Sequence, residues 1–250
     1  MTIYEKVIDN LDKLKLEKMK MVLSDYLDSI SKKSISPLET LAYLTDEEVD
    51  FKQIRASKMR IKIANFPFEK KLEDFDFDYQ TSVNKKEIYD LATLRFIENK
   101  QNILFVGNSG VGKTHLATAL GIEAAQQKYG VYFISCHNLI AQLNLAYKEN
   151  RLENRLKNYA KYKVLIIDEI GYLPIDRMGS NLFFQLIAKR YENKSTIITT
   201  NRPFSRWGEV FDDSTIAAAI LDRLLHHSFI INITGQSYRI KGKLTRKEDN

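Results

Sequence analysis

A glycine-rich octapeptide is the part of this sequence whose residue types and spacing point most directly to chemistry. It runs Gly107-Asn108-Ser109-Gly110-Val111-Gly112-Lys113-Thr114 and matches the pattern G-x-x-x-x-G-K-[ST]. Glycines let backbone N–H groups turn inward around phosphates, and the amino end of a following helix adds positive potential. We therefore expect the octapeptide and the adjoining His115 to bind ATP, with Lys113 on the β and γ oxygens and Thr114 on Mg²⁺.

Two carboxylates follow the apolar run Val164–Ile167. Asp168 would end a buried strand beside the phosphate loop and hold Mg²⁺ through water. Glu169 can orient and deprotonate a water molecule, which favours hydrolysis over transfer of the phosphoryl group to another acceptor. The alternatives are an exposed acidic pair at a strand end and, for the octapeptide, a chance glycine turn before a helix.

Two later polar residues each allow two interpretations. Asn201 follows the run Thr196–Thr199, and it either hydrogen-bonds the γ-phosphate or the attacking water, or forms an ordinary turn. Arg223 lies in an otherwise apolar helix, and it is either an arginine finger for a neighbouring subunit or a residue that pairs with Asp222 or extends its charge into water.

The elements that must position these residues begin near Leu72. Short β-branched and aliphatic runs at 103–106, 131–134, 164–167 and 196–199 alternate with segments of helical length. Runs that are apolar on both faces predict a buried parallel sheet flanked by helices, which is an α/β fold. The uncharged stretch 129–147 has the length of a membrane span, but its polar residues favour a strand, a turn and the start of a helix.

Residues 1–67 contain no such strand and predict a small helical domain ahead of a second domain at 68–250. A helix start is predicted at Ser36-Pro37-Leu38-Glu39, which combines a cap residue, a proline at the first helical position and a glutamate three residues after the cap. Thr45-Asp46-Glu47-Glu48 repeats the capping pattern and predicts a second start. The end of the helical domain is predicted at Asn65-Phe66-Pro67.

Composition limits the class of protein. The 250 residues carry 38 basic and 32 acidic side chains, a net charge of +6, and 44% are hydrophobic, as in an ordinary globular protein. The single cysteine, Cys136, excludes an internal disulfide and an all-cysteine metal site, and it suits a reducing cytoplasm. The first residues show no apolar signal segment, so we expect a cytoplasmic protein without a membrane partner. Cys136 and the four histidines show no metal-ligand spacing and are interpreted as structural.

Two groups of basic residues are candidates for DNA contact. Lys52, Arg55, Lys58 and Lys62 are spaced so that one helical face is positive, which suits binding to phosphates without sequence preference. The alternatives are a solvated face or pairing with the acidic residues at 46–48. A second group follows the fourth apolar run and consists of Arg202 and Arg206 beside Trp207, which is equally suited to packing.

The order of these motifs resembles that of an AAA+ ATPase. The stretches 112–117, 167–172, 195–204 and 221–227 are more specific and are similar to the IstB helper ATPases of insertion sequences, which are relatives of the DnaC helicase loader. The resemblance extends over nearly the whole chain, including the segment Leu14–Met19.

This resemblance implies roles for three residues and a biological setting. Asn201 corresponds to sensor 1, Arg223 to the arginine finger and Arg239, in Ser237-Tyr238-Arg239, to a sensor 2 arginine. The family's activity is ATP hydrolysis in a DNA-bound assembly that helps a transposase to select or activate its target. Only 27 residues follow Arg223, too few for the usual helical lid, so we expect a homo-oligomer formed on ATP or DNA to complete the site. The isolated chain is then a slow ATPase.

Three other functions fit part of the same pattern. A helicase loader shares the ATPase module and differs in its N-terminal helices and partner. A switch that binds ATP without hydrolysing it would need no catalytic Glu169. A kinase of the same fold is disfavoured by the Asp168-Glu169 pair, which suits activation of water.

Overall fold

The computed structural model describes residues 1–31 and 33–241. The chain divides into two compact units, Met1–Met59 and Arg60–Asn250, so the division lies inside a helix rather than after residue 67. The last turn of that helix belongs to the second unit. Arg60 Nε donates a hydrogen bond to the carbonyl of Ala125 at 2.8 Å, and the N–H of Phe133 donates to the carbonyl of Ala64 at 2.8 Å.

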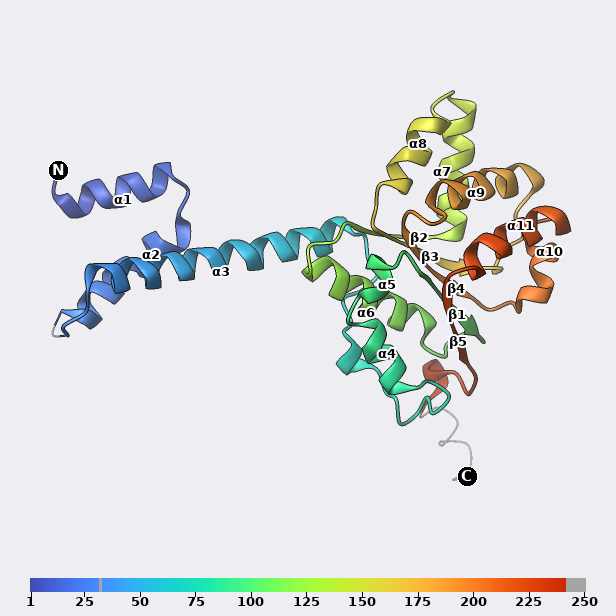
Figure 1. Ribbon diagram of the computed structural model, residues 1–250, viewed down its shortest axis with the longest axis horizontal. Coiled ribbons are helices and arrows are strands. Elements are labelled where there is room, and N and C mark those ends of the chain that lie inside the picture. The colour runs from blue at the N-terminus through green and yellow to red at the C-terminus, as the bar shows by residue number, and fades with distance from the viewer. Residues whose placement is uncertain (32, 242–250) are drawn as a thin grey trace. The chain divides into compact units, whose positions relative to one another are not determined.

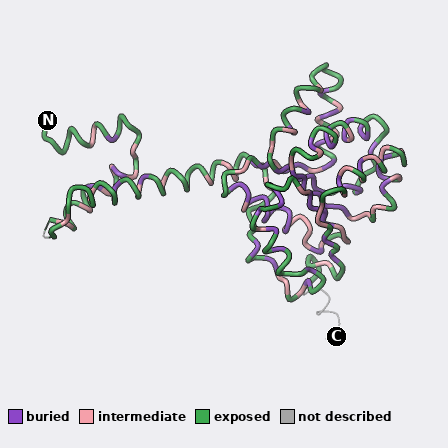
Figure 2. Tube along the Cα trace, viewed as in Figure 1, coloured by how far each residue is buried: buried purple, intermediate pink, exposed green. Residues whose placement is uncertain are grey.

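The first unit contains α1 (Ile3–Lys13), α2 (Glu17–Ile30) and most of α3 (Pro37–Ile63). Its hydrophobic core is small, and most of its residues are exposed (Figure 2). Four buried side chains form the centre of this core, namely Leu11, Met19, Leu23 and Leu44. The prediction of a helical N-terminal region is therefore confirmed.

Capping explains where α3 begins. The N–H of Glu39 donates to Ser36 Oγ at 3.1 Å and the N–H of Ser36 donates to Glu39 Oε2 at 2.7 Å, which is the predicted capping box. The predicted second start at Thr45 is wrong, because α3 runs through it without interruption. Thr45 Oγ1 instead donates to the carbonyls of Leu41 and Ala42 in the preceding turn, so it caps no N–H group.

The second unit is built on a parallel sheet of five strands in the order β2-β3-β4-β1-β5. The strands are β1 (Asn102–Gly107), β2 (Val131–Ser135), β3 (Val164–Ile170), β4 (Ser195–Thr200) and β5 (Ser228–Ile233). The first four coincide with the predicted apolar runs. The edge strand β5 was not predicted, because polar Asn232 interrupts its apolar pattern. In the structure its residues are partly exposed, as suits an edge strand.

Helices cover both faces of this sheet (Figure 1). Ile103 and Phe105 of β1 pack on one face with Leu116 and Leu120, whereas Leu104 between them packs on the other face, as strand alternation requires. The first face is covered by α4 (Lys85–Leu91), α5 (Arg95–Glu98) and α6 (Lys113–Gln126). The second is covered by α7 (Cys136–Lys148), α8 (Leu152–Ala160), α9 (Arg177–Arg190), α10 (Trp207–Val210) and α11 (Ser214–Leu225).

Short 3₁₀ turns complete the described part of the chain. They are η1 (Leu72–Asp74), η2 (Phe204–Arg206) and η3 (Tyr238–Ile240), and only β5 and η3 follow α11 among the described residues. The uncharged stretch 129–147 contains β2 and nearly all of α7, as predicted. Within residues 1–31 and 33–241, no helix combines the length and apolarity needed to cross a membrane.

Candidate active site

The phosphate loop joins β1 to α6 at the carboxyl edge of the sheet. Gly110 and Gly112 have φ angles of +82° and +102°, in the left-handed region that glycine adopts without strain. A Cβ added to Gly112 would lie 2.5 Å from Cε2 of Phe75. The loop therefore needs a glycine at Gly112 for its backbone conformation and for the close approach of Phe75.

Lys113 begins α6 and folds its side chain back over the loop. Its Nζ donates hydrogen bonds to the carbonyls of Gly107 and Asn108, both at 2.7 Å. Burial lowers the pKa of the Lys113 ammonium, the charge of Asp168 opposes this shift and the charge of Arg239 adds to it. The ammonium is thus held inside a loop of backbone groups, in the position expected for a phosphate-binding lysine.

Thr114 and Asp168 meet although they come from different elements. Thr114 Oγ1 in α6 lies 3.0 Å from Oδ1 and 3.2 Å from Oδ2 of Asp168 in β3. Burial raises the pKa of the Asp168 carboxyl, and hydrogen bonds from Thr199 and Thr114 offset only part of this shift. One hydroxyl and one carboxylate side by side are oxygen donors of the kind that Mg²⁺ prefers, so this pair fits the predicted metal site.

Glu169 is turned out of the strand towards solvent. Its φ of +63° lies in the left-handed region, and the pairing of β3 with β4 is irregular between Ile167 and Ile170. A non-glycine residue held at such an angle costs on the order of 1–3 kcal/mol. The carboxylate is exposed directly beside buried Asp168, as activation of a water molecule requires.

Thr199 ties the two acidic residues together, and the sequence reasoning assigned it no role. Its Oγ1 donates to Asp168 Oδ1 at 2.5 Å and accepts the N–H of Glu169 at 2.9 Å. Thr199 is 1% exposed, so its hydroxyl is shielded from water and bonds to these two residues instead. The signal in the sequence was a threonine at the end of an apolar run, two residues before the candidate Asn201.

Asn201 follows β4 and carries an unpartnered acceptor. Its Oδ1 is buried and forms no hydrogen bond with the described residues. A buried polar atom without a partner costs about 1–3 kcal/mol, so a ligand or water in the adjoining cavity that donates to Oδ1 would be stabilising.

These residues surround one cavity of about 510 Å³. The phosphate loop, the carboxylates and Asn201 line it, together with His115, Phe68 and Phe75. His115 Nε2 lies 2.8 Å from the carbonyl of Lys71, and its ring packs edge-on against Phe75. The octapeptide residues from Ser109 to Thr114, together with His115, are therefore placed where a nucleotide would bind.

Arg239 also lines this cavity, although it is distant in the sequence. The N–H of Tyr238 donates to the carbonyl of Gly110 at 2.9 Å, so η3 is attached directly to the phosphate loop. Lys241 forms an ion pair with Asp76, and Gln80 Nε2 donates to the carbonyl of Gln236 at 2.9 Å. Arg239 therefore lies at the cavity that holds Lys113, and its role as a sensor remains a prediction. The sequence is basic from Arg239 to Lys247, and the part of this stretch after Lys241 lies outside the described residues.

Comparison with known proteins identifies the family of this chain. The sequence matches the family of IstB-like ATP binding proteins over residues 9–246. The chain belongs to this family. It is 50% identical over 246 residues to a protein of insertion sequence IS232 from Bacillus thuringiensis subsp. berliner, with 98% of each chain covered. It is 44% identical to a protein of insertion sequence IS21 from Pseudomonas aeruginosa, covering 93% of this chain and 88% of that one. Both relatives are named for ATP binding.

Solved structures confirm the fold of this IstB-like chain. The crystal structure of DnaI aligns with a TM-score of 0.56 and 22% identity, covering 66% of this chain and 90% of DnaI. The DnaC helicase loader aligns with a TM-score of 0.54 and 24% identity, covering 70% of this chain and 98% of DnaC. AMPPCP-bound DnaA from Aquifex aeolicus gives a TM-score of 0.56 at 22% identity, covering 74% of this chain and 57% of DnaA. The second unit therefore has the predicted P-loop AAA+ fold.

Arg223 of the IstB-like chain does not reach this cavity within one subunit. It lies in α11, where its Nη1 donates to the carbonyl of Ala219 at 2.9 Å. Its guanidinium carbon lies 4.7 Å from the ring centre of Phe184 in α9. It is absent from the lining of the cavity that holds Lys113 and Glu169.

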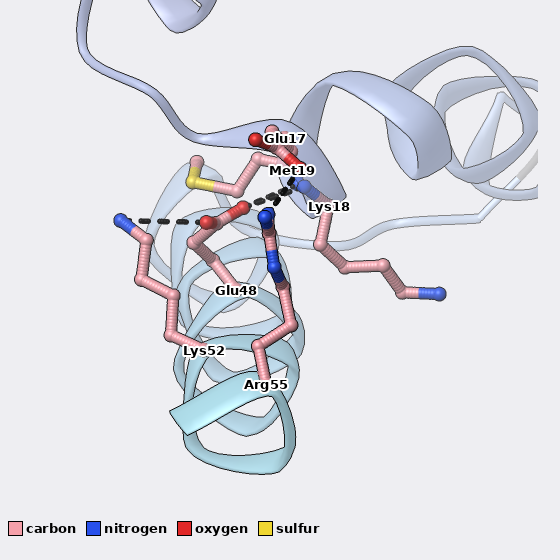
Figure 3. A network of polar contacts seen from close by, with 6 residues as sticks. All are labelled: Glu17, Lys18, Met19, Glu48, Lys52 and Arg55. Carbon is pink, nitrogen blue, oxygen red and sulfur yellow. Dashed lines mark hydrogen bonds and ion pairs between the residues drawn. The ribbon is translucent and has the colours of Figure 1, made fainter. Parts of the chain in front are cut away.

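Two of the four residues in the predicted basic stripe are engaged in ion pairs (Figure 3). Lys52 Nζ lies 3.4 Å from Oε1 of Glu48, and Arg55 Nη1 lies 2.6 Å from Oε2 of Glu17. Lys58 and Lys62 are exposed. The stripe is thus less positive than its sequence indicates, although all four side chains face solvent.

The second basic group is only partly available. Arg206 forms a bidentate pair with Glu209, with N–O distances of 2.7 to 3.1 Å. Arg202 lies half-buried, with Nε 3.4 Å from the carbonyl of Gly171. Trp207 is fully buried in the core, so it packs rather than stacking on nucleic acid.

Proposed function

We propose that this IstB-like chain binds and hydrolyses ATP with Mg²⁺. The observation that carries the proposal is the meeting of Lys113, Thr114, Asp168, Glu169 and Asn201 around one cavity, although they come from three parts of the sequence. Such a set supplies phosphate binding, a metal site and a base for water, which are the parts that hydrolysis of a phosphoanhydride needs from one subunit.

Each residue has a separate task in this proposal. The phosphate loop and Lys113 bind the phosphates, and Thr114 and Asp168 would hold Mg²⁺, which neutralises charge on the phosphate oxygens when bound. Glu169 accepts a proton from the attacking water. Asn201 hydrogen-bonds the γ-phosphate or that water through its amide.

The test is Glu169→Gln, which removes the proton acceptor and preserves shape. We expect ATP binding to persist and turnover to fall by about 10²–10⁴-fold, the range for loss of a general base. Phosphate release and binding of a fluorescent ATP analogue measure the two properties. Lys113→Ala is the matched control, because it should lose binding itself. Undiminished turnover by Glu169→Gln would refute the assignment of the base.

We further propose that the ATPase acts on DNA together with the transposase of its insertion sequence, in target selection or activation. The names of its relatives, each tied to an insertion sequence, support this setting. Lys52, Arg55, Lys58, Lys62, Arg202 and Arg206 are the proposed DNA contacts. A pull-down of the full chain with the cognate transposase and, separately, with a replicative helicase tests the partner. Binding to the helicase alone would favour a helicase loader.

A further inference from the structure

Three metal-ligating side chains meet outside the ATP cavity. Glu192 lies in the turn after α9, and His226 and His227 follow the end of α11. Each offers one ligand atom, and these atoms all lie within 4.8 Å of one another. All three residues are exposed, so an ion can reach them from solvent.

The surroundings of His226 favour a coordinating role. Its Nδ1 lies 2.7 Å from the hydroxyl of Tyr191 and 3.8 Å from Oε1 of Glu192. Nδ1 is thus the ring nitrogen beside Glu192, and an ion shared with Glu192 would take the lone pair of Nδ1 in place of the Tyr191 hydroxyl.

The neighbouring histidine supplies the second nitrogen donor. The ring centres of His226 and His227 lie 4.0 Å apart. Carbonyl groups at the C-terminus of α11 add negative potential nearby, which favours a cation.

We propose that Glu192, His226 and His227 bind a divalent transition metal ion of the zinc type. Two imidazoles and one carboxylate are a donor set that suits such ions and leaves a fourth position for water. Magnesium prefers all-oxygen ligands and would not compete well here.

The bound ion would connect two elements that carry the proposed arginine finger. Arg223 lies three residues before His226 in the sequence, and its guanidinium packs on Phe184 of α9. An ion shared by Glu192 and the two histidines joins the end of α9 to the end of α11. It therefore restrains the part of α11 that presents Arg223, and the ATP cavity itself is untouched.

The test is a titration of the full-length chain, without a histidine tag or nucleotide, with Co²⁺. Tetrahedral nitrogen-containing sites give strong visible absorption bands, whereas octahedral oxygen sites such as a Mg²⁺ position absorb weakly. We expect one Co²⁺ per chain with strong bands that Zn²⁺ abolishes and excess Mg²⁺ does not.

Variants locate the ion. The double variant His226→Ala/His227→Ala should lose the bands, and Glu192→Gln should weaken binding at least about tenfold. His137→Ala is the matched control, because His137 is exposed on α7 and lies outside the cluster. Circular dichroism of each variant checks that it is folded. Equal Co²⁺ affinity in the wild type and the folded double variant, or weak bands in the wild type, would overturn the proposal.

Discussion

Thr199 shows how one hydroxyl can organise two carboxylates. It donates to Asp168 and accepts from the backbone of Glu169, so it links the proposed metal ligand to the proposed base. The N–H contact also helps to hold Glu169 at its unfavourable φ of +63°. Thr199 touches neither water nor phosphate in this scheme and acts as a positioning residue.

We predict that Thr199→Val lowers the kcat of ATP hydrolysis about tenfold or more, with a smaller effect on KM. A lost hydrogen bond to a charged group is worth about 1.5–3 kcal/mol, and about 1.4 kcal/mol corresponds to tenfold in rate. Thr199→Ser keeps the hydroxyl and should recover most of the rate. Steady-state kinetics give both parameters, and a thermal melt separates unfolding from loss of positioning. A valine variant with wild-type kcat would contradict the role.

At this scale, local motifs were predictable and tertiary contacts were not. Lys113 and Thr114 were placed by the pattern of a single loop, and Asp168 by its position at a strand end. The role of Thr199 depends on which residues of β3 and β4 lie beside one another. Glu192 and the histidine pair come together only through the packing of two separate elements, so spacing along the chain gave no sign of them.

Among the elements, α2 depends on a residue of α3 for its start. Glu48 is 3% exposed, and its Oε2 accepts the N–H groups of Lys18 at 2.7 Å and Met19 at 3.0 Å (Figure 3). The first N–H groups of a helix have no partner within it, so this carboxylate serves as the cap of α2. It joins two helices of a unit whose hydrophobic core is small.

We predict that Glu48→Ala destabilises the first unit by about 2 kcal/mol, because one buried and one partly buried N–H group lose their acceptor. Hydrogen exchange of the full-length chain should show faster exchange at Lys18 and Met19, with little change in the second unit. Asp50→Ala is the control, since Asp50 is exposed on the same helix. Equal exchange in the Glu48 and Asp50 variants would contradict the capping role.

The same contact predicts a pH dependence. Burial raises the pKa of the Glu48 carboxyl, but hydrogen bonds from Met19, Lys18 and Lys52 outweigh it, so the net pKa lies below the ordinary value of 4.5. A lowered carboxyl pKa contributes stability that is present above the unfolded value and is lost as the pH falls through the folded one. The difference in exchange between the wild type and Glu48→Ala should therefore shrink below about pH 4.5.

Helices and strands were predicted best where the residues that define them lie close together in the sequence. The capping box at Ser36 gave the start of α3, but a similar pattern at Thr45 lies inside the helix, where backbone bonding continues. Lys52 and Arg55 formed a positive face in the sequence, whereas Glu48 and Glu17 neutralise part of it in the fold. Glu17 belongs to another helix, so its contribution could not be seen from the spacing within one.

At the scale of the whole molecule, Arg223 does not line the ATP cavity of its own subunit. We therefore expect it to act in the ATP cavity of a neighbouring subunit. We predict that Arg223→Ala retains ATP binding and loses DNA-stimulated turnover by about 10³-fold or more, as is typical for loss of an arginine finger. Binding of a fluorescent ATP analogue and phosphate release with DNA measure the two effects.

Mixing the variants provides the sharper control. Arg223→Ala subunits keep Glu169, and Glu169→Gln subunits keep Arg223, so an interface between them can hold one complete site. Turnover should reappear when the two inactive proteins are combined with ATP and DNA. A mixture as inactive as its components would contradict the assignment of Arg223 to a neighbour's site.

The bond between Tyr238 and Gly110 has a practical consequence for work with this protein. A chain cleaved between β5 and η3 would keep all five strands and both layers of helices, so its circular dichroism would look native. It would nevertheless have lost the cap on the Gly110 carbonyl and the charge of Arg239 beside Lys113. We expect a preparation nicked at that point to pass a folding assay and to bind nucleotide weakly. Intact mass should therefore be verified before any weak binding is attributed to a mutation.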